Sequence, residues 1–170
     1  GTWGGGLTHI TDQGRVTFTR ANGLQEEAVS GVMEDDNGGL WLCWNTEGLS
    51  YLRNGRFSHY RAREGVSDRV CGMGLDEAGS MWVATSKGVR KLMNGYFVDV
   101  KLPAEMTQPG SLLVDSKKRI WVASRGGVGY FEHGHWTQVA VEANPANQKA
   151  PHQIIEDPRG DLWVLRDELQ

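Results

Sequence analysis

Two histidines, His133 and His135, stand two residues apart, a spacing that could place two imidazole ligands on one metal ion. No third ligand follows at a recognisable spacing, so we expect no metal there. Asp35, Asp36 and Asn37 offer the oxygen ligands that calcium prefers, but a calcium loop needs more of them close together. The sequence therefore predicts no metal and no other cofactor.

Motifs for covalent catalysis are also missing from the sequence. The serines lack the Gly-x-Ser-x-Gly turn that exposes a nucleophile. Gly4, Gly5 and Gly6 lack the lysine and the following helix of a phosphate-binding loop. We therefore expect that this chain is not an enzyme.

Side chains suited to binding a small molecule lie in the segments between the apolar runs. Tryptophan rings can stack on a sugar, and arginine forks can hold an anionic group. The alternative is an ordinary solvated rim of polar loops. The residues that we predict as ligand contacts are Trp3, Trp44, Asn45, Glu47, Arg63, Asp68, Arg69, Lys87 and Arg125.

A repeated sequence pattern determines where these loops lie. Tryptophan returns at intervals of 41, 39 and 42 residues, each time six positions after an aspartate. A glycine stands three positions before the tryptophan in three copies, and Lys118 replaces it in the other. This pattern predicts a tight turn that leads into a strand. The pairs are Asp35 and Trp41, Asp76 and Trp82, Asp115 and Trp121, and Asp157 and Trp163.

Both recurrent residue types are expected to be structural. One tryptophan per copy is better explained by packing between neighbouring sheets than by ligand stacking, because an aromatic side chain buries about 150 to 250 Å². Replacing it with alanine is expected to lower the free energy of unfolding by about 3 to 5 kcal/mol. The aspartate is expected to accept hydrogen bonds from the amides of its turn.

Each copy of the repeat is expected to form four short strands. Asn54-Gly55 and Asn94-Gly95 separate runs of alternating polarity, which predicts type I′ hairpins because both central residues need a positive φ. His133-Gly134 takes the corresponding place in a third copy, and no segment carries a long helical stripe. In the copy around Trp41 we place the strands near 29–34, 40–44, 49–53 and 56–61.

The predicted fold class is all-β, with four-stranded antiparallel sheets that stack as the blades of a β-propeller. Residues 1–4 and 162–166 would both supply the tryptophan strand, so we expect an incomplete arc rather than a closed four-bladed ring. The expected segments are a partial blade at 1–27, blades at 28–67, 68–107 and 108–149, and a partial blade at 150–170.

Composition limits the classes of partner. The 170 residues include 18 basic and 21 acidic side chains, which does not favour a basic nucleic-acid-binding protein. No run approaches the roughly 18 to 20 apolar residues of a membrane span, so no direct membrane insertion is expected. The composition is that of a globular domain.

The sequence of the repeat resembles that of the two-component regulator propeller family, which is found in the extracytoplasmic sensor domains of bacterial sensor kinases. Trp82-Val83-Ala84-Thr85 and Trp121-Val122-Ala123-Ser124 fit the motif closely, and Gly-Leu or Gly-Val follows. Trp44 and Arg166 depart from it where a small hydroxyl residue is usual, and Lys118 departs from it where glycine is usual. The resemblance runs through essentially the whole chain.

This resemblance implies part of a seven-bladed periplasmic propeller that senses a ligand without catalysis and signals to a transmembrane histidine kinase. The implied ligand is a small molecule or an oligosaccharide. Further implied partners are the remaining blades and kinase region of a parent chain, and a second copy in a homodimer.

Two alternative functions belong to other classes. The Asp-x-x-Gly-x-Leu-Trp motif that begins at Asp35 also resembles the repeats of streptogramin-lyase-like propellers. Those proteins act on ring-shaped esters with histidine and magnesium. No matching catalytic cluster can be transferred to this chain. The other alternative is a propeller scaffold whose faces only dock proteins.

Overall fold

The computed structural model describes residues 4–44, 46–141 and 149–165, which divide into two compact units. Unit 1 extends to Val70 and unit 2 begins at Cys71. Regular structure in the described residues is β-strand, apart from two 3₁₀ turns at Arg20–Asn22 and Ala62–Glu64. The prediction of an all-β fold is confirmed.

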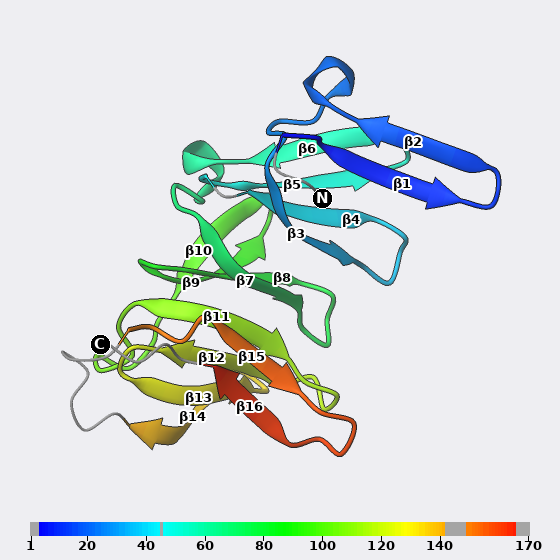
Figure 1. The fold of residues 1–170 in the computed structure, drawn as a ribbon. Coiled ribbons are helices and arrows are strands. Elements are labelled where there is room, and N and C mark those ends of the chain that lie inside the picture. The colour runs from blue at the N-terminus through cyan, green and yellow to red at the C-terminus, as the bar shows by residue number, and fades with distance from the viewer. Residues whose placement is uncertain (1–3, 45, 142–148, 166–170) are drawn as a thin grey trace. The chain divides into compact units, whose positions relative to one another are not determined.

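Unit 1 contains a two-stranded and a four-stranded antiparallel sheet (Figure 1). In the four-stranded sheet each strand pairs with the next along the chain, in the order β3-β4-β5-β6. These strands confirm the predicted ones, with the last ending one residue earlier. The strands are β1 (Leu7–Thr11), β2 (Gly14–Phe18), β3 (Val29–Glu34), β4 (Leu40–Trp44), β5 (Leu49–Arg53) and β6 (Arg56–Tyr60).

Unit 2 repeats the same sheet order twice and adds a two-stranded sheet. The strands are β7 (Val70–Leu75), which starts at the unit boundary, β8 (Met81–Thr85), β9 (Gly88–Met93), β10 (Tyr96–Val100), β11 (Pro109–Val114), β12 (Ile120–Ser124), β13 (Gly127–Glu132), β14 (His135–Val141), β15 (Gln153–Glu156) and β16 (Leu162–Leu165).

The three hairpins between third and fourth strands have the predicted turn chemistry. Asn54, Asn94 and His133 have φ values of 50°, 51° and 49°, and the glycine that follows each is also at positive φ. The first hairpin of the chain differs, because Thr11 pairs with Gly14 and leaves Asp12 and Gln13 in the turn. Gly14 therefore belongs to β2 and not to the turn.

The core of unit 1 lies between its two sheets. Leu7 of β1 packs with Leu42 and Trp44 of β4 and with Leu52 of β5. Phe18 and Phe57 meet edge to face at the border of this core, with ring centroids 5.8 Å apart. Burial of these apolar side chains holds the smaller sheet on the larger one.

Unit 2 buries side chains in two layers between its three sheets. In the first layer, Trp82 of β8 lies 5.4 Å from Phe131 of β13, measured between ring centroids. In the second, Trp121 and Val128 pack with Ile154 of β15. Each sheet thus covers a face that its neighbour cannot bury alone, as expected for propeller blades.

The recurrent tryptophans are buried in the complete sheets. Trp41, Trp82 and Trp121 are 5%, 7% and 6% exposed, which confirms their packing role. Trp163 differs, with 54% of its surface exposed. The described part of the chain supplies no third strand beside β16, so no strand covers this ring on that side.

Candidate functional site

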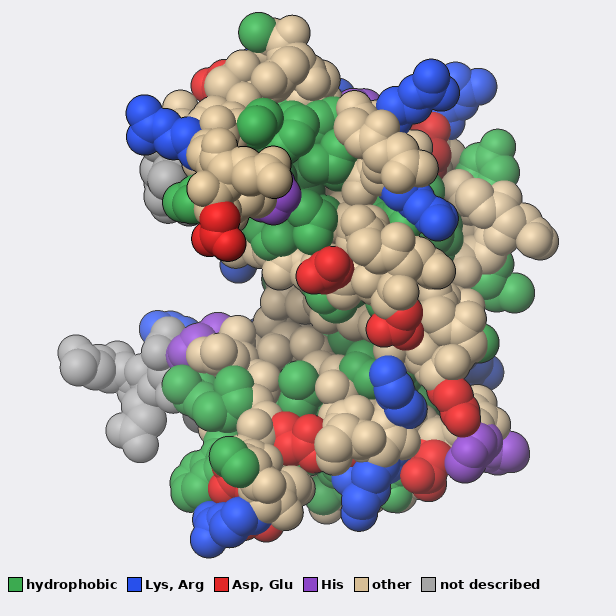
Figure 2. Space-filling view, turned by 90° about the vertical axis from the view of Figure 1, so that its right-hand side faces the viewer, with side chains coloured by type: hydrophobic (Ala, Val, Ile, Leu, Met, Phe, Trp, Pro, Cys, Tyr) green, Lys and Arg blue, Asp and Glu red, His purple; other side chains and the backbone are tan. Residues whose placement is uncertain are grey.

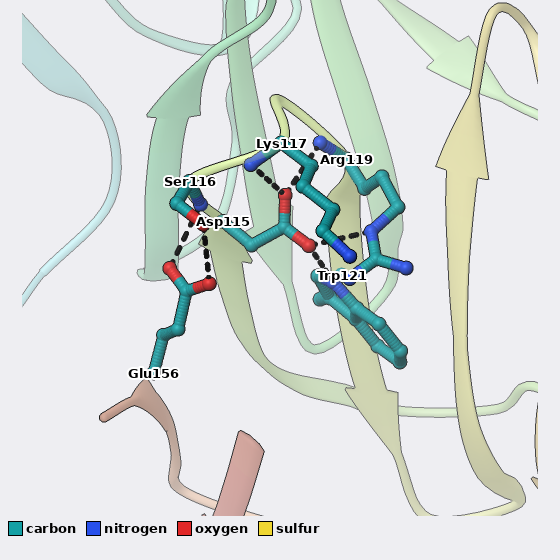
Figure 3. A network of polar contacts seen from close by, with 6 residues as sticks. All are labelled: Asp115, Ser116, Lys117, Arg119, Trp121 and Glu156. Atoms are coloured by element: carbon teal, nitrogen blue, oxygen red, sulfur yellow. Dashed lines mark hydrogen bonds and ion pairs between the residues drawn. The ribbon is translucent and has the colours of Figure 1, made fainter. Parts of the chain in front are cut away.

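The Asp115 carboxylate accepts four hydrogen bonds and is buried (Figure 3). Oδ1 accepts hydrogen bonds from the backbone N–H groups of Lys117, at 2.9 Å, and Arg119, at 2.8 Å. Oδ2 accepts from Trp121 Nε1, at 2.8 Å, and from Arg119 Nε, at 2.6 Å. The aspartate therefore closes its turn, as predicted, and also orients the tryptophan six residues later, which sequence reasoning missed.

The second carboxylate oxygen is satisfied differently in the other sheets of the chain. Asp76 Oδ2 accepts from Trp82 Nε1, at 2.8 Å, and from Lys91 Nζ, at 2.7 Å. Lys91 is the cross-strand partner of Trp82, so β9 supplies this cation. In this sheet the residue opposite the tryptophan on the third strand supplies the second donor to the aspartate, whereas for Asp115 that donor is Arg119.

In unit 1 that third-strand partner is a tyrosine. Tyr51 donates its hydroxyl proton to Asp35 Oδ2 at 2.6 Å and lies opposite Trp41. The buried Trp41 Nε1 consequently has no hydrogen-bond partner among the described residues.

These contacts keep the carboxylates ionised. Burial by itself opposes ionisation of Asp115, yet hydrogen bonds from Trp121 and Arg119 lower the pKa of its carboxyl below the ordinary value of 3.8. Burial also opposes ionisation of Asp76, and contacts from Lys91 and Trp82 outweigh it and lower its pKa. Both side chains are best described as structural anions.

The neighbouring sheet fixes the Asp115 turn from outside. Glu156, at the end of β15, accepts hydrogen bonds from Ser116 N at 2.8 Å and from Ser116 Oγ at 2.7 Å (Figure 3). Two bonds to one carboxylate hold the turn in a defined place.

The predicted ligand contacts in the described residues lie at the opposite end of the strands, in or next to the loops between second and third strands and in the loop between β6 and β7. Trp44 is fully buried in the core of unit 1, and its Nε1 has no hydrogen-bond partner among the described residues. Its side chain therefore belongs to the packing and not to the rim, because it points toward Leu7, Leu24 and Leu52. Trp3 and Asn45 lie outside the described residues.

The remaining candidates of unit 1 occupy two adjacent loops. Gly48 N donates to the carbonyl of Asp68 at 3.1 Å, which brings the loop after β4 against the loop before β7. Ser67 Oγ donates to the half-buried Asp68 carboxylate at 3.3 Å. Glu47, Arg63 and Arg69 are exposed.

In unit 2 the structure brings together two side chains from adjacent loops. Arg125 Nη1 donates to Gln108 Oε1 at 3.4 Å, and the Arg125 backbone N–H donates to the carbonyl of Thr107 at 3.0 Å. Arg125 is half-buried, whereas Lys87 is exposed. The pair of Arg125 and Gln108 is the best-organised part of the predicted rim.

The histidine pair does not form a metal centre in the described residues. His135 Nδ1 lies 3.2 Å from the carbonyl of His133, and both side chains are exposed. No group of three His, Cys, Asp or Glu side chains that could hold a metal ion occurs in the described ranges.

A hollow of about 350 Å³ lies in unit 2 among residues of β7–β10 and β11–β14, at the end of the strands that carries the aspartate turns. Its lining includes Glu77, Lys91, Lys118, Phe131 and His133. Sequence reasoning did not select this hollow. The available signal was the replacement of the usual turn glycine by Lys118 and of the usual hairpin asparagine by His133.

Solved structures show the same fold in proteins of different kinds. Virginiamycin B lyase from Staphylococcus aureus matches 96% of this chain and 57% of its own, with a TM-score of 0.75 and 15% identity. The extracellular domain of a protein described as a hybrid two component system from B. thetaiotaomicron matches 95% of this chain and 22% of its own, with a TM-score of 0.70 and 16% identity.

A gluconolactonase from Xanthomonas campestris matches 95% of this chain and 62% of its own, with a TM-score of 0.63 and 11% identity. These likenesses establish the β-propeller fold. The chain spans a little over half of the lyase and less than a quarter of the extracellular domain. No protein-family model and no curated protein matches the chain. Within the described residues, no helix has the length and apolar character needed to cross a membrane.

Proposed function

We propose that the chain is a non-enzymatic, ligand-sensing part of a periplasmic β-propeller receptor that signals to a transmembrane histidine kinase. The repeated sequence motif is the observation that supports this proposal. Trp-Val-Ala-Thr lies on β8 and Trp-Val-Ala-Ser on β12, and Gly-Val begins the following strand in each case, β9 and β13. The fold shared with an extracellular domain of a hybrid two component system supports it. The receptor would contain the further blades of the parent chain and pair as a homodimer.

The ligand proposed for the rim is an oligosaccharide. Sugars are held by planar polar groups that bond adjacent hydroxyls, and the Arg125 guanidinium beside the Gln108 amide offers donors and an acceptor of this kind. The exposed Lys87, on the equivalent loop of the preceding sheet, offers a further donor. In unit 1, Glu47, Arg63, Asp68 and Arg69 would contribute contacts from their adjacent loops.

Calorimetry of the intact parent ectodomain against a panel of oligosaccharides tests the proposal. We expect one fragment to bind and the variant Arg125→Ala to weaken its binding about tenfold, as for loss of one charge-assisted hydrogen bond. Arg56→Ala removes an exposed arginine beside the Asn54-Gly55 hairpin, at the opposite end of the strands, and serves as the matched control. Absence of heat across the panel would overturn the carbohydrate assignment.

A lyase is the second candidate, favoured by the TM-score of 0.75 for virginiamycin B lyase against 0.70 for the extracellular domain. Ring opening of virginiamycin B in the presence of Mg²⁺, followed by mass spectrometry, tests it with the parent protein. Turnover that is lost in His133→Ala or His135→Ala would establish the lyase and displace the sensor. Unchanged substrate would eliminate it.

A further inference from the structure

The hollow of unit 2 gathers the positions where this chain departs from its own repeat. Lys118 stands where the other three aspartate turns have Gly38, Gly79 and Gly160. His133 stands where two other hairpins have asparagine. Both residues line the hollow, although fifteen residues separate them in the sequence.

Lys118 occupies a backbone conformation that lysine does not favour. Its φ is 63°, close to the 72° of Gly38 and the 75° of Gly79 in the equivalent turns. A side chain in this left-handed region strains the backbone, and glycine would avoid the strain. The turn itself therefore does not require lysine, which directs attention to the ammonium group at the hollow.

The two walls of the hollow carry opposite charge. The wall from β7–β10 supplies Asp76, Glu77 and Lys91, and the Asp76 carboxylate is already paired with Lys91 Nζ at 2.7 Å. Glu77 is thus the carboxylate of that wall that no ion pair engages within the described residues. This wall keeps one net negative charge.

The facing wall, from β11–β14, has the opposite balance. It supplies Lys117, Lys118, Glu132 and the imidazole of His133, all exposed. No ion pair engages Lys118 or Glu132 in the described part of the chain. Figure 2 looks onto this end of the strands and shows acidic, basic and histidine side chains side by side at its lower right.

Apolar side chains form the floor between the two charged walls. Trp82, Ile120 and Phe131 line the hollow and are 7%, 3% and 7% exposed. The volume of about 350 Å³ is near the lower end of the range of ligand pockets, so a small ligand of about a dozen non-hydrogen atoms fits it. The hollow therefore combines one negatively charged wall, one positively charged wall and an apolar floor.

We propose that this hollow binds a small zwitterion of the amino-acid class with an apolar side chain. Its ammonium group bonds the Glu77 carboxylate, and its carboxylate bonds the ammonium group of Lys118, with His133 beside it. The apolar side chain lies over Phe131 and Ile120. This inference does not rest on the proposed sensing function, because the hollow and the predicted rim lie at opposite ends of the strands.

The test titrates the 170-residue chain with three compounds that share one side chain: phenylalanine, 3-phenylpropanoate and phenethylamine. Chemical-shift changes in two-dimensional NMR spectra report binding and its location. We expect phenylalanine to bind, and each compound lacking one charge to bind about tenfold more weakly, because it loses one charge-assisted contact. Equal binding of 3-phenylpropanoate, or no binding of phenylalanine at millimolar concentration, would overturn the proposal.

The variant Lys118→Gly separates binding from folding. It restores the glycine of the repeat, so we expect the thermal midpoint to rise by about 2 to 4 °C while the affinity for phenylalanine falls about tenfold. Glu77→Gln is expected to lower affinity similarly, whereas Lys101→Ala, an exposed change away from the hollow, is expected to leave it unchanged. Unchanged affinity in Lys118→Gly would contradict the assignment even if the protein becomes more stable.

Discussion

At the scale of single residues, the four recurrent aspartates accept the same hydrogen bonds at Oδ1 and different ones at Oδ2. In every copy Oδ1 accepts hydrogen bonds from the amides two and four residues later, at distances of 2.8 to 3.0 Å. Oδ2 instead accepts from donors that differ between the copies: Tyr51 for Asp35, Trp82 and Lys91 for Asp76, Trp121 and Arg119 for Asp115, and Trp163 and Arg159 for Asp157. The bonds to Oδ1 fix the turn, and the bonds to Oδ2 orient the tryptophan or the residue opposite it on the third strand.

Asp115→Asn is expected to lower the free energy of unfolding by about 1 to 3 kcal/mol, because it leaves Arg119 without its anion and puts an amide NH2 donor where a carboxylate oxygen accepted hydrogen bonds. Urea unfolding at pH 7 measures this loss. Asp12→Asn, at an exposed hairpin position, is the matched control and should change stability by less than about 0.5 kcal/mol.

The same variant should alter the pH dependence of stability. The pKa of Asp115 is lower in the folded chain than in the unfolded chain, so the unfolded chain binds more protons below about pH 4. The contribution of Asp115 is complete above that pH and is lost as the pH falls through its folded pKa. Urea midpoints between about pH 5 and 2.5 should fall less steeply in Asp115→Asn than in the parent sequence. Parallel curves would contradict this role.

Trp41 and Trp121 offer a matched comparison of a buried indole with and without a hydrogen bond. Trp121 donates to Asp115, whereas Trp41 Nε1 has no partner in the described residues. Trp121→Phe should therefore lower the free energy of unfolding by about 1 kcal/mol more than Trp41→Phe. Equal losses in chemical denaturation would show that the bond to Asp115 adds no net stability.

At the scale of elements, the exposure of each tryptophan depends on the strand beside it. Trp82 on β8 is 7% exposed because β9 and the facing sheet cover it, and Trp163 on β16 is 54% exposed. Trp82→Ala should lower the free energy of unfolding by about 3 to 5 kcal/mol, and Trp163→Ala by less than about 1 kcal/mol. Calorimetric unfolding of both variants of this chain checks the contrast, and similar losses would contradict it.

The loop after β12 is held by a close approach of two backbones. A Cβ atom on Gly126 would lie 1.5 Å from the carbonyl oxygen of Glu105, and the neighbouring Arg125 N–H bonds Thr107. Gly126→Ala should therefore force the loops apart and lower the thermal midpoint by several degrees. Gly95→Ala is a useful comparison, because open space surrounds its Cβ and only its φ of 85° opposes the change. A milder effect of Gly126→Ala than of Gly95→Ala would refute the close contact.

The strands could be predicted from sequence because turn chemistry marks their ends. Asn54-Gly55 and the Asp35 turn fix two of the three hairpins of the sheet around Trp41, and the periodicity predicts the same arrangement in its neighbours. Trp44 shows where this reasoning fails. It takes the place of a small hydroxyl residue beside a loop, but its side chain enters the core between two sheets, a placement set by the partner sheet.

The hollow of unit 2 was beyond sequence reasoning for a related reason. Lys118 and His133 were recognisable as departures from the repeat, but each could be placed only within its own turn. Their meeting with Glu77 depends on how two sheets face one another. Departures from a repeat are thus informative about sites only after the packing of the blades is known.

At the scale of the whole molecule, blades of one design leave functional variation to the two ends of the strands. Buried apolar layers and aspartate turns recur in both units with little change. The loops and turns differ, and they carry both the proposed rim and the hollow. A lyase, a gluconolactonase and the extracellular domain of a hybrid two component system share this fold, so the fold alone does not assign a function.

The central claim is that a ligand at the rim controls a kinase in the parent receptor. Autophosphorylation of the intact receptor in membrane vesicles, with and without the oligosaccharide identified by calorimetry, measures this most directly. The account predicts a ligand-dependent change in phosphorylation that Arg125→Ala shifts to about tenfold higher ligand concentration and that Arg56→Ala, at the opposite end of the strands, leaves in place. Phosphorylation that is indifferent to the bound ligand would contradict it.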